Sequence, residues 1–98
     1  MDFKVIWSQG AINDLHEICS YIAQSNPEAA SRMGNGLLEH VQILTKFPFI
    51  GPAYPRGANG PLREIVFRSY RIFYDVSQDR GQVDILHIWH GARGEPVL

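Results

Sequence analysis

The sequence has little cysteine and no long apolar run, and each absence excludes a class of protein. Cys19 is the only cysteine among the 98 residues, so the chain can form neither an intrachain disulfide nor a zinc site built from several cysteine ligands. No segment approaches the roughly 18 consecutive apolar residues of a membrane span, and residues 1–5 lack the basic start of a secretion signal. We therefore expect a cytoplasmic protein that makes no membrane contact.

An excess of basic residues is also missing. Nine Lys and Arg residues face ten Asp and Glu residues, which gives a formal net charge of −1. Proteins that hold a nucleic-acid backbone usually carry a basic excess, because neutralising phosphates releases counterions. Tight generic binding to DNA or RNA is therefore disfavoured.

The composition is that of an ordinary soluble domain. Hydrophobic residues make up 45% of the chain and charged residues 19%, close to the average for globular proteins. A chain of this length can bury one hydrophobic core but not two independent ones. We expect a single domain over residues 1–98, folding without metal or disulfide.

A short strand and two helices are predicted in the first half of the chain. Apolar residues alternate over residues 3–7, as in a strand, and then recur at spacings of three and four along residues 11–22 and 30–44. Ser8 and Asn26 precede these two stripes and are good N-caps. Because the connection between the helices is short, they should form an antiparallel hairpin.

Four residues within these helices carry further information. Asp14 and Glu17 lie early in the first helix, where acidic side chains interact favourably with the helix dipole. Gly34 and Gly36 interrupt the second helix, and each costs about 1 kcal/mol relative to alanine. They indicate either close packing against a neighbouring backbone or a frayed helix.

The second half of the chain predicts a sheet. Residues 62–67, 70–76 and 83–90 are rich in β-branched and aromatic side chains and are separated by short turns, which predicts a three-stranded antiparallel meander. Residues 49–61 are dense in glycine and proline, which predicts a surface connection without regular structure. The expected fold class is α+β, with a short N-terminal strand, an antiparallel helical hairpin and the meander, and with the helices packed on one sheet face.

The second strand of the meander separates core residues from a candidate site. Strand alternation places Tyr70, Ile72 and Tyr74 on one face, where large apolar side chains indicate core. Arg71 falls on the other face and needs an anionic partner there. Asp75, on the same face, is the local candidate.

Polar residues also gather at the end of the last predicted strand. His87 and His90 are three residues apart and point to opposite faces of a strand, so they predict no metal site. His90 is either a general acid or base or a structural residue. Arg93 suits recognition of a phosphate or carboxylate, or is simply solvated. The chain has no phosphate loop, dinucleotide fingerprint or nucleophile elbow, so we expect no cofactor.

Several short motifs, taken in order, span nearly the whole chain. They are Ala11 with Asn13-Asp14-Leu15 and Ile18, Tyr21-Ile22-Ala23, Asn26-Pro27 with Ala30, Leu44 with Phe47-Pro48 and Gly51, Arg63-Glu64, Tyr70-Arg71-Ile72 with Tyr74, and His90-Gly91-Ala92-Arg93. Their order and spacing resemble the RelE/ParE toxin superfamily, and most closely its ParE branch of plasmid-stabilisation toxins from type II toxin–antitoxin systems. The resemblance implies the same α+β fold.

The resemblance implies one of two activities. RelE-like members are ribosome-dependent endoribonucleases that cleave mRNA, whereas ParE-like members inhibit DNA gyrase. Arg71 and Arg93 match the two arginines of the ribonuclease pattern. At the paired lysines of that pattern only Arg63 is present, and residues 94–98 contain no tyrosine. The resemblance therefore favours a non-enzymatic gyrase inhibitor.

Two alternatives remain open at this point. A histidine-using ribonuclease would place Glu64, Arg71 and His90 in catalytic roles together with Arg93, and a decayed member of the family would keep only a binding role. The resemblance also implies a cognate antitoxin, through which alone the toxin would contact DNA. Candidate residues for binding the target or the antitoxin are Arg63, Arg71, His90 and Arg93.

Overall fold

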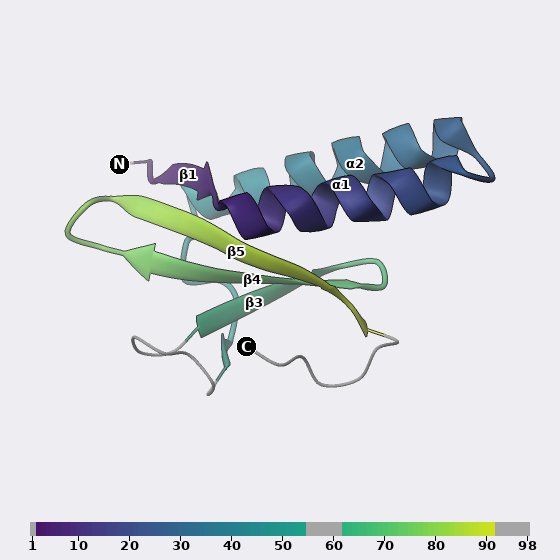
Figure 1. The fold of residues 1–98 in the computed structure, drawn as a ribbon. Coiled ribbons are helices and arrows are strands. Elements are labelled where there is room, and N and C mark those ends of the chain that lie inside the picture. The colour runs from purple at the N-terminus through teal and green to yellow at the C-terminus, as the bar shows by residue number, and fades with distance from the viewer. Residues whose placement is uncertain (1, 55–61, 92–98) are drawn as a thin grey trace.

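The computed structural model describes residues 2–54 and 62–91, which form two helices packed against one face of a five-stranded sheet (Figure 1). The elements follow in the order β1 (Lys4–Trp7), α1 (Gln9–Ala23), α2 (Pro27–Val41), a 3-10 helix η1 (Gln42–Thr45), β2 (Ala53–Tyr54), β3 (Leu62–Phe67), β4 (Tyr70–Ser77) and β5 (Gln82–His90). This order confirms the predicted α+β class.

The sheet is mixed, with the strand order β1-β5-β4-β3-β2. Strands β3, β4 and β5 pair antiparallel in sequence order, which confirms the predicted meander. Strand β1 pairs with β5 in parallel, with Lys4 opposite Gln82 and Trp7 opposite Ile85. The N-terminal strand thus extends the sheet beside the last strand of the meander.

The prediction that residues 49–61 lack regular structure is wrong at β2. Residues 53–54 pair with the first part of β3, and the Glu64 N–H donates to the Pro52 carbonyl at 3.2 Å. An edge strand leaves backbone groups unpaired, and even a two-residue strand satisfies some of them. Residues 55–61 lie outside the described residues.

Both helices begin where their caps predict. The Ser8 hydroxyl oxygen accepts a hydrogen bond from the Ala11 N–H at 3.1 Å, and the Asn26 side-chain oxygen accepts one from the Ala29 N–H at 3.0 Å. Helix α2 continues directly into η1, so the second apolar stripe reaches Leu44 through a tighter turn rather than through one continuous α-helix.

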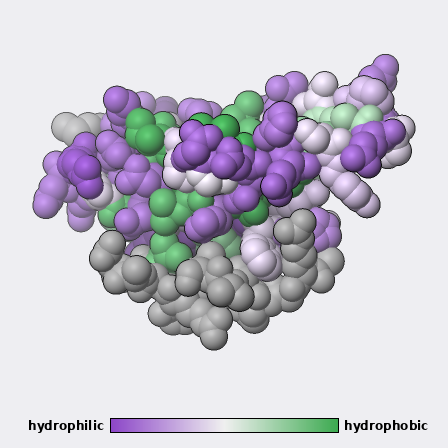
Figure 2. Space-filling model, viewed as in Figure 1, coloured by the Kyte–Doolittle hydropathy of each residue, from purple (hydrophilic) through white to green (hydrophobic). Residues whose placement is uncertain are grey.

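The hydrophobic core lies between the helices and the sheet. Residues of both layers are 0% exposed, among them Ala11, Leu37, Val41, Leu44, Ile72, Tyr74, Val83 and Ile85. Tyr70 also belongs to this core, as strand alternation predicts. Polar side chains cover most of the outer surface of the helices in the view of Figure 2, and neither described helix is long and apolar enough to cross a membrane.

The two glycines in α2 mark close packing, but against side chains rather than backbone. A Cβ atom at Gly34 would lie 3.0 Å from the Cys19 Sγ of α1, and one at Gly36 would lie 2.6 Å from the Phe67 ring of β3. The alternative of a frayed helix is wrong, because α2 runs without a break through both positions.

Candidate functional site

Glu64 on β3 and Arg71 on β4 form an ion pair on the sheet face that points away from the helices. The Arg71 Nε donates to one carboxylate oxygen of Glu64 at 2.8 Å, and a terminal guanidinium nitrogen donates to the other oxygen at 3.1 Å. The Arg71 side chain is 20% exposed and the Glu64 side chain 19%. Such two-point pairing fixes the guanidinium and neutralises its charge locally.

The prediction that Asp75 is the partner of Arg71 is wrong, and the strand register gives the reason. Val66 stands opposite Arg71, and Phe73 stands opposite Glu64. Glu64 is therefore the diagonal neighbour of Arg71 on the same face, within reach of a long side chain. Asp75 is four residues away along the same strand, a separation of roughly 13 Å.

Three residues, Arg63, Tyr74 and Gly51, hold the segment before β2 against the sheet, and we call them the loop anchor. The Arg63 Nη1 donates to the carbonyls of Gly51 at 2.7 Å and Phe49 at 3.3 Å. The buried Tyr74 hydroxyl accepts a hydrogen bond from the Gly51 N–H at 3.0 Å. A Cβ atom at Gly51 would lie 2.3 Å from the Glu64 carbonyl oxygen, so no side chain fits there.

The environment of Tyr74 also changes its acidity. Burial raises the pKa of the Tyr74 phenol above its ordinary value, while the hydrogen bond from Gly51 and the charge of Arg63 act in the opposite direction. Burial prevails because the phenolate would lose most of its hydration. Arg63 contributes to the fold through its hydrogen bonds to the carbonyls of Gly51 and Phe49, and its role as a candidate contact for the target or the antitoxin stays a prediction.

His90 lies on the opposite face of the sheet from the Glu64–Arg71 pair. It stands opposite Tyr70 in the β4–β5 ladder, whereas Arg71 stands opposite Trp89. The His90 ring packs edge-on against the Tyr70 ring, with the two centroids 5.0 Å apart. The structure therefore brings Glu64 and Arg71 together and separates them from His90.

His87 and His90 point to opposite faces, as strand alternation predicts. His87 stands opposite Phe73, and its Nδ1 lies 3.8 Å from a carboxylate oxygen of Asp14. Within residues 2–54 and 62–91, no three His, Cys, Asp or Glu side chains gather closely enough to hold a metal ion. The expectation that the protein needs no cofactor stays a prediction. Arg93 lies outside the described residues.

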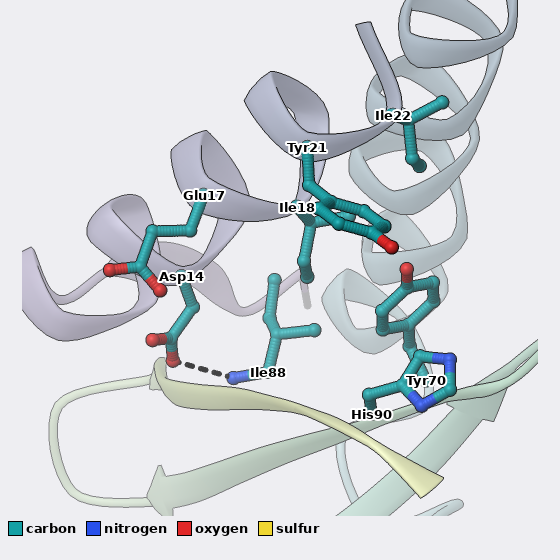
Figure 3. A pocket seen from close by; sticks show the side chains of 8 residues that line it. All are labelled: Asp14, Glu17, Ile18, Tyr21, Ile22, Tyr70, Ile88 and His90. Atoms are coloured by element: carbon teal, nitrogen blue, oxygen red, sulfur yellow. Dashed lines mark hydrogen bonds between the residues drawn. The ribbon is translucent and has the colours of Figure 1, made fainter. Parts of the chain in front are cut away.

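A cleft of about 530 Å³ opens between α1 and the end of the sheet (Figure 3). Its lining side chains come from α1, β4 and β5 and are Asp14, Glu17, Ile18, Tyr21, Ile22, Tyr70, Ile88 and His90. The rings of Tyr21 and Tyr70 approach each other across the cleft, with their hydroxyl groups pointing toward one another (Figure 3). Tyr21 is 75% exposed, whereas Tyr70 is 9% exposed.

One wall of the cleft is fixed by hydrogen bonds between α1 and β5. Strand β1 pairs with β5 only as far as Ile85. Beyond that point the Asp14 carboxylate accepts a hydrogen bond from the Ile88 N–H at 3.0 Å, and the Ser8 hydroxyl donates to the Leu86 carbonyl at 3.2 Å. The helix therefore takes the place of a neighbouring strand along this part of the sheet edge.

Sequence reasoning missed three of the residues that line the cleft. Asp14 and Glu17 were expected to interact with the helix dipole, but neither lies in the first turn of α1, which contains no acidic residue. Together with Tyr21 they line the cleft instead. The signal was present in the sequence, because positions 14, 17, 18 and 21 are three or four residues apart and share one helix face.

Comparisons with known proteins agree with this fold over nearly the whole chain. The model of a family described as the ParE toxin of the type II toxin–antitoxin system parDE matches residues 5–94. The chain is 38% identical over 91 residues to "Toxin RelE2" of Caulobacter vibrioides, covering 92% of this chain and 97% of that protein. It is 30% identical over 97 residues to "Putative toxin Y4kP" of Sinorhizobium fredii, covering 97% of this chain and 95% of that protein.

Two solved structures share the arrangement of helices and sheet. A chain of the chromosomal ParDE TA system from P. aeruginosa superposes with a TM-score of 0.73 at 22% identity, covering 90% of this chain and 95% of that one. A chain of the toxin–antitoxin complex RelBE2 from Mycobacterium tuberculosis gives a TM-score of 0.69 at 20% identity, covering 92% of each. At these identities the likeness concerns the fold.

Proposed function

The chain belongs to the ParE toxin family of type II toxin–antitoxin systems, and from this premise we propose that it stops growth by inhibiting DNA gyrase through protein contacts. One observation carries the proposal. Of the residues that match a ribonuclease, Arg71 is held at two points by Glu64, and His90 lies on the other face of the sheet. This separation of His90 from Glu64 and Arg71 supports a toxin that acts without the histidine-using catalytic group.

Cleavage of mRNA makes demands that this arrangement meets poorly. Attack by a 2′-hydroxyl requires a base close to that hydroxyl and cationic groups at the phosphate. A guanidinium already held by a carboxylate offers little charge to a phosphate, and the carboxylate is equally occupied. Arg63 donates to two backbone carbonyls, and the net charge of −1 gives no general attraction for RNA. Inhibition through protein contacts has none of these requirements.

Neutralisation by a cognate antitoxin is the second part of this proposal. The solved structures that share the fold are of a ParDE toxin–antitoxin system and of the toxin–antitoxin complex RelBE2. A toxin of this family requires such a partner in the cell that produces it. Contact with DNA would then occur only through the antitoxin, in keeping with the lack of a basic excess.

Two assays on the purified protein test this function. The protein should inhibit supercoiling by gyrase and leave mRNA intact in a translation extract. A ribonuclease would have to use the same two residues, Glu64 and Arg71, which lie side by side on the sheet face away from the helices. Cleaved mRNA with normal supercoiling would establish that alternative. If neither assay responds and induction without an antitoxin leaves growth unchanged, the protein has only a binding role.

A further inference from the structure

The cleft between α1 and β5 combines negative charge with exposed aromatic surface. Asp14 and Glu17 place two carboxylates along its α1 side. Tyr21, three quarters exposed, and the largely buried Tyr70 supply two rings. None of the eight lining residues is a lysine or arginine. The described lining of the cleft thus holds two carboxylates without a lysine or arginine, and only the Asp14 carboxylate has a basic side chain nearby, with the His87 Nδ1 at 3.8 Å.

An arginine side chain has the properties that fit this composition. Its planar guanidinium pairs with carboxylates and stacks on aromatic rings, and it is weakly hydrated for a cation. Its aliphatic stem can lie along apolar surface, which Ile18 and Ile22 provide in the same cleft. Asp14 uses one carboxylate oxygen for the Ile88 N–H, which fixes that side chain and leaves the other oxygen for a ligand.

We propose that this cleft receives an arginine side chain of the cognate antitoxin, an inference that rests on the proposed toxin function. Charge decides between the two expected protein partners. A negatively charged cleft repels DNA phosphates, so it does not suit the surface that meets gyrase on its DNA. The antitoxin binds DNA if the family resemblance holds, and a DNA-binding protein needs basic side chains, which the carboxylates of the cleft would attract. Tyr21 is the exposed aromatic contact, of the kind that contributes most to binding energy at protein interfaces.

The first experiment identifies the chemistry of the ligand without the antitoxin. Arginine amide is titrated into the isotopically labelled toxin, and amide chemical shifts are followed by NMR. Citrulline amide has nearly the same shape and the same α-ammonium group but a neutral urea in place of the guanidinium, and it serves as the matched ligand. Saturable shifts at Tyr21, Ile88 and His90 with arginine amide alone are expected. Equal shifts with both ligands, or no shifts at these residues, would overturn the proposal.

The second experiment measures the affinity of the purified antitoxin, taken as the protein encoded beside the toxin gene, for toxin variants. Glu17→Gln removes one charge from an exposed position and should weaken binding by about fivefold. It should also reduce the dependence of the affinity on salt, which a merely structural role would not do. Glu39→Gln is the matched control, because Glu39 is exposed on α2 and lines a separate pocket beside Phe67. Equal affinities for both variants would contradict the proposal.

Other occupants give different results in the same experiments. Shifts at Tyr21 and Ile88 that Mg²⁺ reproduces would indicate a cation site and overturn the proposal. Self-association of the toxin that Glu17→Gln abolishes would identify a second copy of this chain as the occupant, with the same consequence. Failure of gyrase inhibition, by contrast, overturns only the proposed target, because the affinity of the antitoxin and the shifts with arginine amide are measured without gyrase.

Discussion

On the β3 side of the sheet, Arg63 of β3 and Tyr74 of β4 hold the segment before β2 in place, whereas beside β5 the carboxylates of Asp14 and Glu17 border an open cleft. On the first side the polar groups are engaged within the protein, in hydrogen bonds to Phe49 and Gly51. On the second side Glu17 and Tyr21 are exposed to solvent. The two sides therefore differ in what their polar side chains bind.

This difference separates residues that resemble a catalytic site from residues that can recognise a partner. Arg63 and Arg71 match a family pattern in sequence, yet their observed contacts are with Gly51 and Glu64. Tyr21 and Glu17 match no catalytic motif, yet they line the cleft. Substitutions on the β3 side should therefore change stability, and substitutions in the cleft should change binding.

The largest expected effect is at Gly51 in the loop anchor. Gly51→Ala places a Cβ atom 2.3 Å from the Glu64 carbonyl oxygen and 2.7 Å from the Tyr74 hydroxyl. The free energy of unfolding in urea should fall by about 3 kcal/mol, as for an overpacked core. Gly10→Ala is the matched control, since its nearest neighbour lies at 3.4 Å and alanine favours a helix. An unchanged free energy of unfolding for Gly51→Ala would show that the loop anchor can shift to make room for the Cβ atom.

Removal of the Tyr74 hydroxyl should have the next largest effect. Tyr74→Phe leaves the Gly51 N–H without its acceptor in a buried site, which costs about 1 to 2 kcal/mol. Tyr21→Phe removes the same atom from a side chain that is 75% exposed and should leave the stability unchanged. Equal stabilities for the two variants would remove the contrast between the loop anchor and the cleft.

The Glu64–Arg71 pair should contribute less, because both side chains retain some contact with water. A double-mutant cycle with Glu64→Gln and Arg71→Gln should give a coupling energy of about 1 kcal/mol in urea denaturation. The two-point geometry favours the upper end of the range for partly exposed pairs. A coupling energy near zero would mean that the pair does not hold β3 to β4.

The smallest expected effect is in the pH dependence of stability. Burial raises the pKa of Tyr74 in the folded state, so at high pH the unfolded chain loses this proton first and the folded state binds more protons. The contribution of Tyr74 to the free energy of unfolding is fully present below the ordinary tyrosine pKa of about 10. It is lost as the pH rises through the higher pKa that Tyr74 has in the folded state. Unfolding free energies should therefore fall more steeply above that pH for the wild type than for Tyr74→Phe. Parallel profiles would contradict this.

Local patterns predicted the fold better than the site. Strand alternation assigned Tyr70 and Ile72 to the core, and Ser8 marked the start of α1, because these features depend on neighbouring residues. The parallel pairing of β1 with β5 and the choice of Glu64 as the partner of Arg71 depend on register between distant strands. Alternation gives the face of a side chain but not its position along the adjacent strand.

The cleft could not be derived because it forms where three separate elements meet. The spacing of Asp14, Glu17 and Tyr21 indicates one helix face, but only the packing of α1 over β4 and β5 brings Tyr70 and His90 to that face. The position of His90 opposite Tyr70 likewise depends on the pairing of β4 with β5.

The most direct test of this account is a gyrase supercoiling assay on the purified Glu64→Gln toxin beside the wild type, with mRNA followed in a parallel translation extract. If the Glu64–Arg71 pair is structural and gyrase is the target, both proteins inhibit supercoiling and both leave mRNA intact. A wild-type protein that cleaves mRNA without affecting gyrase, together with loss of that cleavage in Glu64→Gln, would contradict both the structural role of the pair and gyrase as the target.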